Sequence, residues 1–556
     1  MKRWHKALLG TLAGLAILGG AGYVWRTPLA LAFVSWRSSI AVAPNRPVPW
    51  QAGPATAAAP PAERAPNIVF ILFDDLGMND ISTFGGGVAG GKVPTPNIDR
   101  LAAEGAIFTQ AYAGNATCSP SRAQLMTGRY STRTGFEYTP TPPGFPRVVS
   151  MVSNDIRPDR PPVEYDAAAD AASPPFAEQG LPSEEVTLAE VLKAGGYHTV
   201  HIGKWHLGSS DRFHPITQGF AESLNLDGLL HLPEDHPEAV NARIDFDPID
   251  RFLWASAQFV TSYNNGEKFA PGGYLADYWT DESLKVIAAN RNRPFFLYLA
   301  HWGVHSPLQA TRADYAAVGD IGGPHRLRVY AAMIRALDRS VGRIMAKLEA
   351  EGLADNTLVV ISSDNGAPGY LGLEGLNAPF RGGKGTFFEG GIRVPLLVRW
   401  PARIAAGTQV PIPAGQVDIM PTLAAAAGAA LPTGVAIDGR NLLPALTGER
   451  DSVPADAPLF WNSGYYKAVR SGDWKLQINE KQGKAWLYNL AADPHETTNL
   501  AAAEPERRKA LEALITAHHR SRRAPLYPST FSMAVSIDRT LATPFQRDEE
   551  FIYWPN

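Results

Sequence analysis

The fold is decided by the stretch Asn67-Ile68-Val69-Phe70-Ile71-Leu72-Phe73-Asp74-Asp75. Seven residues pass without a charge, and two carboxylates follow at once. A continuous apolar run of this length is typical of a parallel strand that is buried on both faces. Runs of the same kind recur at residues 197–203, 294–300, 357–362 and 393–400. We therefore predict a sheet in the interior of the molecule, with residues 67–73 as one of its strands.

Helical patterns separate these strands. They occupy residues 96–111, 121–127, 188–194, 277–290, 325–351 and 416–427. The alternation of strands and helices predicts an α/β fold, a doubly wound parallel sheet with helices on both faces. In such folds the catalytic groups lie just beyond the carboxyl ends of the strands.

Composition is that of an ordinary globular enzyme. The 556 residues are 45% hydrophobic and 19% charged, and this length allows one large domain with a sizeable core plus a smaller domain. The chain carries 51 Lys and Arg against 54 Asp and Glu, which leaves a net charge of −3. A chain without basic excess is not expected to bind nucleic acid.

The N-terminus has the pattern of an export signal. Lys2, Arg3 and Lys6 precede an uncharged and mostly apolar run at residues 7–25. This run is close to the ~20 residues that span a bilayer, so a cleaved signal and an uncleaved membrane anchor both stay open. We assign residues 1–40 to this signal or anchor, and we expect a periplasmic or extracellular protein.

The rest of the chain divides into three parts. Residues 41–66 are rich in Ala and Pro and are predicted to form a semi-rigid linker that holds the body off the membrane. Residues 67–441 form the predicted catalytic domain, in which residues 135–182 lack periodicity and are expected to be a long loop. Residues 442–556 form a smaller C-terminal α+β domain, with a hairpin predicted at 466–476 and a short strand at 486–490.

Oxygen-bearing side chains follow two of the predicted strands. Asp74 and Asp75 end the first strand, and Asp364 and Asn365 follow the strand at 357–362. Each pair alone fits a turn or a helix cap, but two pairs in equivalent places favour a shared site. Their hard oxygen donors suit Ca²⁺ or Mg²⁺ better than zinc.

Basic side chains follow two further strands. Lys204 and His206 lie two residues apart, so in an extended chain they point to the same side. His301 and His305 follow the strand at 294–300. Taken alone, the Lys-x-His pair fits a solvated edge, and a histidine after a buried strand fits a core group with satisfied hydrogen bonds.

Cys118 is the single cysteine and cannot form an intramolecular disulfide. Taken alone, it fits a small buried hydrophobe. Pro120 suits the first turn of a helix and Gly128 its end, so Cys118 is expected at a helix N-terminus, where an anion is favoured. Arg122, one turn further on, could return to the same place with two parallel donors for an oxyanion.

These residues together resemble a known family. The run Cys118-Ser119-Pro120-Ser121-Arg122 with Leu125-Met126-Thr127-Gly128-Arg129 is similar to the signature of the type I sulfatases, in which the cysteine is oxidised to formylglycine. Further blocks of the family occur in the family's order: Asp74-Asp75-Leu76-Gly77, Gly203-Lys204-Trp205-His206-Leu207-Gly208, His305-Ser306-Pro307, Ser363-Asp364-Asn365-Gly366 and Gly382-Gly383-Lys384-Gly385. The resemblance covers about residues 66–500. Val304 departs from it, since the family often has proline there.

The resemblance implies a fold, a reaction and partners. The fold would be alkaline-phosphatase-like, with a large mixed, mostly parallel sheet sandwiched by helices and a small C-terminal antiparallel sheet. The reaction would be hydrolysis of a small-molecule or carbohydrate sulfate ester to an alcohol and inorganic sulfate, by attack of the formylglycine hydrate on sulfur. A formylglycine-generating enzyme would mature the chain. One Ca²⁺ ion would be held by Asp74, Asp75, Asp364, Asn365 and the hydrated aldehyde at Cys118.

The resemblance also implies roles for the basic residues. Arg122 and Lys204 would steady the aldehyde hydrate and the sulfate. His206 would take the proton that lets the sulfated intermediate collapse, and His305 and Lys384 would assist the leaving alcohol. Such groups answer a physical need, because a sulfate ester is an anion whose charge must be neutralised before a nucleophile can approach.

Three other functions stay open at the level of sequence. A phosphonate or phosphate ester hydrolase could use the same scaffold, formylglycine and metal ligands. A catalytically silent relative could bind sulfated glycans with Cys118 unmodified, and a thiol enzyme could pair Cys118 with a histidine. The joint presence of Lys204, His206, His305 and Lys384 favours sulfate. Aryl sulfate, choline sulfate and sulfated sugar all stay open as the ester.

Overall fold

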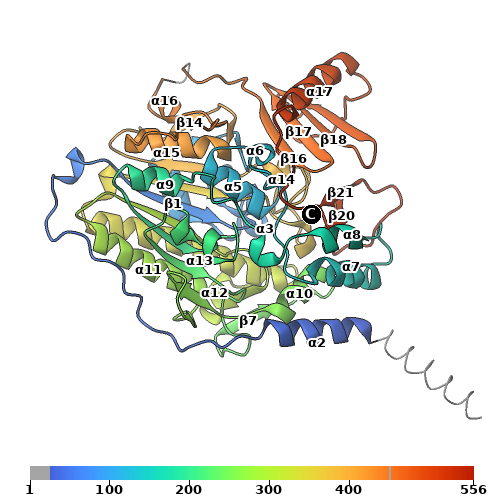
Figure 1. The fold of residues 1–556 in the computed structure, drawn as a ribbon, viewed down its shortest axis with the longest axis horizontal. Coiled ribbons are helices and arrows are strands. Elements are labelled where there is room, and N and C mark those ends of the chain that lie inside the picture. Colours follow the sequence, from blue (N-terminus) through green and yellow to red (C-terminus); the bar gives the residue numbers. More distant parts are fainter. Residues whose placement is uncertain (1–24, 450–451) are drawn as a thin grey trace, which may run out of the picture.

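A computed structural model describes residues 25–449 and 452–556, and a ten-stranded sheet lies at its centre (Figure 1). The order of the strands is β14 (Thr408–Val410), β2 (Ala106–Phe108), β13 (Leu396–Arg399), β12 (Thr357–Ser363), β1 (Asn67–Phe73), β10 (Phe295–Ala300), β5 (His198–Gly203), β6 (Glu222–Leu226), β8 (Thr261–Tyr263) and β9 (Lys268–Phe269). β12, β1, β10, β5 and β6 run parallel to one another. The implied mixed, mostly parallel sheet is confirmed.

One strand of the predicted parallel set runs the other way. The run at residues 393–400 becomes β13, which is antiparallel to β12, so the parallel direction predicted for this one run is wrong. The reason lies in the chain before it: the N–H of Gly366, just after β12, donates to the carbonyl of Gly391, just before β13. The chain therefore enters β13 at the edge where β12 ends, and it must run back.

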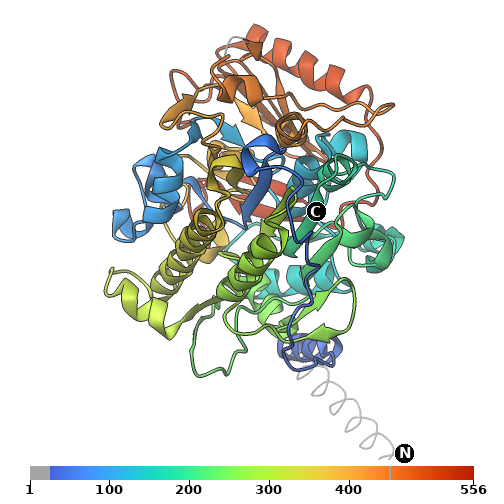
Figure 2. The same ribbon diagram turned by 90° about the vertical axis from the view of Figure 1, so that its left-hand side faces the viewer.

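Strand β1 is buried on both faces, as its sequence predicts. Ile68, Phe70 and Leu72 belong to one core and Val69, Ile71 and Phe73 to the other, because side chains alternate along a strand. The first core includes helices α5 (Cys118–Thr127), α9 (Leu188–Ala194) and α15 (Ile419–Ala427). The second includes α4 (Pro96–Ala103), α11 (Leu275–Asn290) and α13 (His325–Ala350), and Figure 2 shows the last two lying side by side.

Most predicted helices end within three residues of the observed ones, but the helix predicted at 96–111 is too long. It ends at Ala103, and residues 106–108 instead form β2 between β13 and β14. Gly105 marks the change, because a Cβ there would lie 2.4 Å from the carbonyl oxygen of Val398. Pairing with β13 overrides the local helical pattern.

The predicted long loop at residues 135–182 is also wrong. It contains α7 (Phe145–Ile156), α8 (Ala167–Ala172) and the short strand β4 (Glu164–Tyr165). Val149 and Val152 of α7 are buried, and this helix packs against α10 (Pro248–Ser256). The helix has an amphipathic pattern of its own, with Phe145, Val148 and Met151 beside the buried valines, and the prediction missed it because the flanking segments are rich in Pro, Asp and Ala.

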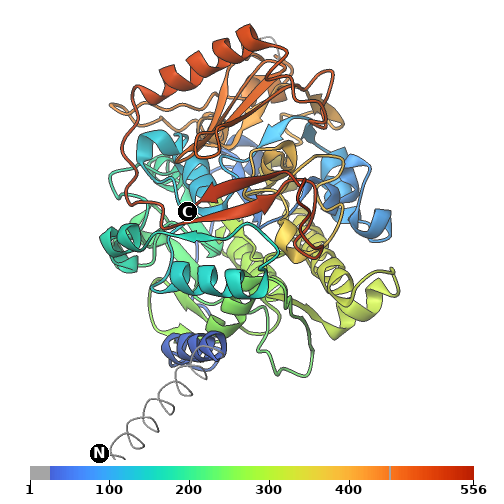
Figure 3. The same ribbon diagram turned by 90° about the vertical axis from the view of Figure 1, so that its right-hand side faces the viewer.

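The C-terminal part contains the predicted antiparallel sheet (Figure 3). Its strands are β16 (Leu459–Ser463), β17 (Tyr466–Ser471), β18 (Trp474–Asn479) and β19 (Lys484–Asn489), and α17 (Pro505–His519) packs on them. The hairpin predicted at 466–476 is β17 and β18. The last strands, β20 (Phe531–Ser536) and β21 (Phe551–Pro555), form a separate small sheet with β4. The domain boundaries stay predictions.

Residues 41–66 lie against the body, so a linker that holds the body away is the wrong prediction for this segment. Ala43 forms a bridge with Phe269 of the edge strand β9. The N–H of Gln51 donates to Glu222 over 2.8 Å, and the N–H of Gly53 donates to the carbonyl of Ala289 over 2.8 Å. Residues other than proline in this stretch can donate through their backbone N–H groups. An edge strand such as β9 has backbone N–H and C=O groups without a partner in the sheet, and these can pair with the segment.

The predicted signal or anchor falls largely on residues 1–24, which lie outside the described residues. The described chain opens with α2 (Arg26–Ser38). Within residues 25–449 and 452–556, no helix has both the length and the apolar character needed to cross a bilayer.

The end of β5 gives a test of the fold. Gly203 has φ +108, and a Cβ on it would lie 2.0 Å from the carbonyl oxygen of Ala300 in β10. We expect Gly203→Ala to lower the free energy of unfolding by at least about 3 kcal/mol, because a clash with backbone adds to backbone strain. Denaturant unfolding measures it. Gly196→Ala is the matched control, since its φ is +87 with nothing within 4 Å of a Cβ. Equal losses in the two variants would show that the close approach is unimportant.

Candidate active site

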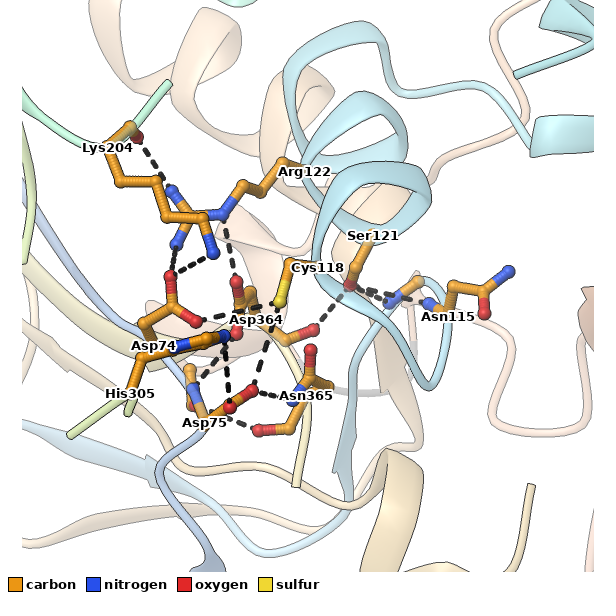
Figure 4. Close-up of polar contacts among 12 residues, drawn as sticks. Asp74, Asp75, Asn115, Cys118, Ser121, Arg122, Lys204, His305, Asp364 and Asn365 are labelled. Carbon is orange, nitrogen blue, oxygen red and sulfur yellow. Dashed lines mark hydrogen bonds and ion pairs between the residues drawn. The ribbon is translucent and has the colours of Figure 1, made fainter. Parts of the chain in front are cut away.

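Four neighbouring parallel strands end at one place and supply the site (Figure 4). Asp364 and Asn365 follow β12, Asp74 and Asp75 follow β1, His305 lies beyond β10, and Lys204 follows β5. The strands are in register, with Phe73 opposite Ser363 and Ala300 opposite both Leu72 and Gly203. Side chains that are far apart in sequence are therefore brought together by the sheet itself.

The turn after β1 is held by the turn after β12. The N–H of Asp75 donates to Asp364 Oδ1 over 3.2 Å, and the N–H of Leu76 donates to Ser363 Oγ over 3.0 Å. Asp75 has φ +61, an uncommon conformation for a residue with a side chain. Asn365 Nδ2 donates to Asp75 Oδ1 over 2.7 Å. The carboxylate of Asp75 is thus fixed in position by its neighbour strand.

Cys118 is the first residue of α5, and every side chain of this helix is buried. Gly128 ends the helix with φ +63, as its sequence predicts. Ser121 Oγ donates to the carbonyl of Asp364 over 2.5 Å, which fixes the helix start above β12. Cys118 Sγ consequently lies 3.5 Å from Asp74 Oδ1 and 3.8 Å from Asp75 Oδ1.

Arg122 joins three parts of the site and is completely buried. Its Nη2 donates to Asp74 Oδ2, its Nε to Asp364 Oδ2, and its Nη1 to the carbonyl of Lys204, each over 2.8 Å. A guanidinium in this arrangement has no freedom to turn away. The donors shown go to two carboxylates and a carbonyl, and the predicted role of Arg122 toward an oxyanion stays a prediction.

Two ammonium groups each face one of the two carboxylates that follow β1. Lys204 Nζ lies 2.6 Å from Asp74 Oδ2, and Lys384 Nζ lies 2.7 and 2.9 Å from the two oxygens of Asp75. Burial raises the pKa of Asp74, but the charges of Lys204 and Arg122 outweigh burial and lower this pKa below its usual value. Burial lowers the pKa of Lys384, but Asp75 raises it well above its usual value. Asp74 and Lys384 are therefore both charged at neutral pH.

The backbone conformation at His206 differs from the predicted one. β5 ends at Gly203 and His206 has φ +65, so the extended Lys-x-His geometry is wrong. Burial, followed by the charges of Lys204 and Arg122, lowers the pKa of His206 well below 6.5. The imidazole is neutral, and it lies within the field of the two cations.

Of the two histidines after β10, only His305 lies at the site. Its Nε2 is 3.6 Å from Asp75 Oδ2, its Nδ1 donates to the carbonyl of Ser306 over 2.6 Å, and its ring stacks on Trp302. Burial and then Lys384 lower the pKa of His305 well below 6.5. His301 lies in the core, where its Nε2 is 2.9 Å from Ser340 Oγ.

The environment of Cys118 disfavours its thiolate. Burial raises the pKa of Cys118, and the carboxylates of Asp364 and Asp74 raise it further. The thiolate, not the thiol, is the nucleophile in cysteine chemistry. The partners of its sulfur are two carboxylates and Lys384 Nζ at 3.3 Å, with no imidazole among them in the described structure. This geometry counts against a thiol enzyme.

The residues present fit a hard cation. Ligand atoms of Asp74, Asp75, Cys118 and His305 all lie within 4.8 Å of one another. Asn365 Oδ1 is buried without a hydrogen-bond partner, so it is an open oxygen ligand beside them. Asp364 adjoins this group, although Arg122 holds one of its oxygens. A set dominated by carboxylate and amide oxygens suits Ca²⁺ or Mg²⁺.

Two residues of the site, Tyr370 and Trp302, were not predicted from the sequence. The hydroxyl of Tyr370 donates to Asp75 Oδ2 over 3.1 Å and lies 3.5 Å from Lys384 Nζ. Nothing in its Gly-Pro-rich surroundings marks it as a site residue. The ring of Trp302 stacks on that of His305, and its centroid lies 4.8 Å from Lys204 Nζ. The position of Trp302 just after a buried strand is the feature that could have identified it from the sequence.

The comparison with family models decides the family. The model described as Sulfatase matches residues 66–429, well over half of the chain. The chain belongs to the sulfatase family. A second model, described as N-sulphoglucosamine sulphohydrolase, C-terminal, matches residues 383–522. This sulfatase is accordingly a hydrolase of sulfuric esters, which is the reaction that its sequence predicted.

Individual relatives agree with this assignment. Human N-acetylgalactosamine-6-sulfatase is 36% identical over 409 residues, which cover 72% of this chain and 69% of that protein. Human arylsulfatase A is 34% identical over 471 residues, covering 81% and 82%. The crystal structure of Ps i-CgsB in complex with k-i-k-neocarrahexaose superposes with a TM-score of 0.68 and 28% identity, covering 84% of this sulfatase and 95% of that chain.

Tyr370 gives a test of the site. We expect Tyr370→Phe to lower kcat/KM about tenfold or more, because one hydrogen bond to a charged carboxylate such as that of Asp75 is worth about 1.5–3 kcal/mol. Steady-state kinetics on a sulfate ester measures the change. Tyr165→Phe is the matched control, since Tyr165 donates to Asp170 far from the site. Equal kinetics for the two variants would show that the Tyr370 hydroxyl does not contribute to catalysis.

Proposed function

We propose that Cys118 is matured to formylglycine and acts with one Ca²⁺ ion to hydrolyse a carbohydrate sulfate ester. The observation that carries the proposal is the position of Cys118 at the start of a buried helix, among two carboxylates and a lysine ammonium. The ion would be held by Asp74, Asp75, Asp364, Asn365 and the side chain at position 118.

The chain's own cations would bind the sulfate group. Lys384 Nζ lies 3.3 Å from Cys118 Sγ, Arg122 and Lys204 pair with Asp74 beside it, and Cys118 itself stands at the N-terminus of α5. Preorganised donors of this kind stabilise negative charge without reorganising as the reaction proceeds. A bound Ca²⁺ ion would supply further charge neutralisation, and a hydrated formylglycine would supply a hydroxyl nucleophile.

His206 and Lys384 would move the protons, and His305 would assist the leaving alcohol by its position. His206 is neutral, because its pKa lies well below 6.5, so it can accept a proton from the side chain at position 118. His305 is held by Ser306 and Trp302 with its Nε2 toward Asp75, and it would lie near the departing alcohol oxygen together with Lys384. Because the neutral ring of His305 uses its Nδ1–H on Ser306, its Nε2 has no proton to give, and the protonated Lys384 would be the donor to the leaving oxygen.

A carbohydrate ester is favoured by the relatives. The human relative is named for a sulfatase of N-acetylgalactosamine, and the superposed crystal structure contains neocarrahexaose. Aryl and choline sulfates are the competing esters, and phosphonate monoesters are the competing class. We further propose that the chain is exported and that residues 7–25 tether it, with maturation by a formylglycine-generating enzyme before it acts.

A combined experiment tests the function. The chain is purified from a host that contains a formylglycine-generating enzyme, and the peptide that includes Cys118 is analysed by mass spectrometry. We expect an aldehyde at position 118, hydrolysis of sulfated sugars in preference to aryl sulfates and phosphonate monoesters, and loss of activity with EGTA that added Ca²⁺ restores.

The control for this experiment is Cys118→Ser, which fills the same space but has no thiol to oxidise. We expect its activity to fall to background with its fold intact. Quantitative thiol at position 118 in a fully active sample would contradict the maturation, and a clear preference for phosphonates would contradict the substrate.

The pH dependence of kcat tests the role of His206. A pKa well below 6.5 in the folded protein means that His206 stays neutral down to pH 6.5, so kcat should decline only at lower pH. The same shift affects stability, because the unfolded chain takes the proton first as pH falls below about 6.5. The stability due to His206 is therefore complete above that pH and is lost below it. His206→Asn should remove both effects, and an unchanged acid limb in this variant would exclude His206 as the group.

A further inference from the structure

Helix α2 exposes an unusual apolar face. Trp25, Leu29, Phe33, Trp36 and Ile40 follow one another at intervals of three or four residues, so they lie along one side of the helix and its ends. Their exposed fractions reach 71% for Trp36 and 61% for Trp25. In residues 25–449 and 452–556 the other exposed large hydrophobic residues are Leu431 and Val435 alone. Apolar exposure is thus concentrated on this outer face of α2.

The opposite side of α2 is fixed to the body. Arg26 Nε donates to Asp155 Oδ2 over 3.0 Å, and the hydroxyl of Thr27 donates to the same oxygen over 2.9 Å. The helix packs against α7 and α10, and Figures 1 and 3 place it at the end of the molecule opposite α17. A helix held in this way cannot turn its aromatic side chains inward.

The sequence before α2 indicates what covers this face. Residues 7–25 carry no charge and run directly into the helix at Trp25, with Lys2, Arg3 and Lys6 before them. A run of this kind is long enough to enter a bilayer, whereas α2 with 13 residues is not. Tryptophan is enriched at the boundary between lipid and water, where its ring is apolar and its N–H is polar.

We propose that the outer face of α2 is a membrane-binding surface. The helix lies along the bilayer with Leu29, Phe33 and Trp36 in the boundary region between headgroups and acyl chains. Because α2 is fixed to α7 and α10, it does more than tether the protein. It sets the orientation of the catalytic body relative to the bilayer, which a flexible linker would leave free.

The place of Trp36 tests the proposal. The full chain is reconstituted in phosphatidylcholine vesicles whose acyl chains do or do not carry bromine, a quencher of tryptophan emission. The emission of wild type minus that of Trp36→Phe isolates Trp36 among the 13 tryptophans. We expect this difference signal to shift to shorter wavelength on reconstitution and to lose most of its intensity with brominated lipid.

Two matched double variants complete the test. Leu29→Gln/Phe33→Gln changes the outer face of α2, whereas Leu431→Gln/Val435→Gln changes the other exposed apolar site by the same chemistry. We expect the first to weaken the bromine quenching of Trp36, the second to leave it unchanged, and both to keep full hydrolysis of a soluble ester. An unquenched Trp36 in protein that stays on the vesicles would overturn the proposal. It would mean that residues 1–24 or a second copy of the chain cover the face.

Discussion

The ion pairs of Arg122 with Asp74 and Asp364 are the constraint on which the site depends. All three side chains are fully buried, and burying charge costs more than the pairing returns unless every group is well hydrogen-bonded. Arg122 meets this condition with three donors at 2.8 Å, the third to the carbonyl of Lys204. One guanidinium therefore ties α5 to the ends of β1, β12 and β5. The helix that begins with Cys118 cannot shift without exposing an unpaired charge.

The balance of charge follows from that constraint. Asp74, Asp75 and Asp364 meet Arg122, Lys204 and Lys384, so the cluster is close to neutral as a whole. An anionic ester entering a neutral cluster meets attraction and repulsion at close range, and the result depends on which groups it faces. The ammonium groups and the start of α5 lie around Cys118, while Arg122 holds the inner carboxylates back. Affinity for an anion thus comes from the arrangement of charges and not from their sum.

Much of this site could be predicted because parallel strands end together. Continuous apolar runs located β1, β5, β10 and β12, and the polar residues after each run had to converge. What could not be predicted depends on contacts between distant segments. The direction of β13 follows from a hydrogen bond between Gly366 and Gly391, and residues 41–66 are docked by the edge strand β9, by the side chain of Glu222 and by a carbonyl of α11. Tyr370 reaches Asp75 from a loop with no periodicity, so only its final position reveals it.

Cys118 shows why one environment suits one kind of nucleophile. A cysteine enzyme needs a thiolate, and burial together with the carboxylates of Asp364 and Asp74 raises the pKa of the Cys118 thiol and so opposes that charge. A hydroxyl nucleophile makes the opposite demand, because it stays neutral until attack and gives up its proton as it reacts. Carboxylates that oppose a thiolate can therefore accept a hydrogen bond from a hydroxyl at this position. Those of Asp74 and Asp75 lie 3.5 and 3.8 Å from Cys118 Sγ. The same electrostatics that weaken Cys118 as a thiol favour an oxygen nucleophile at position 118.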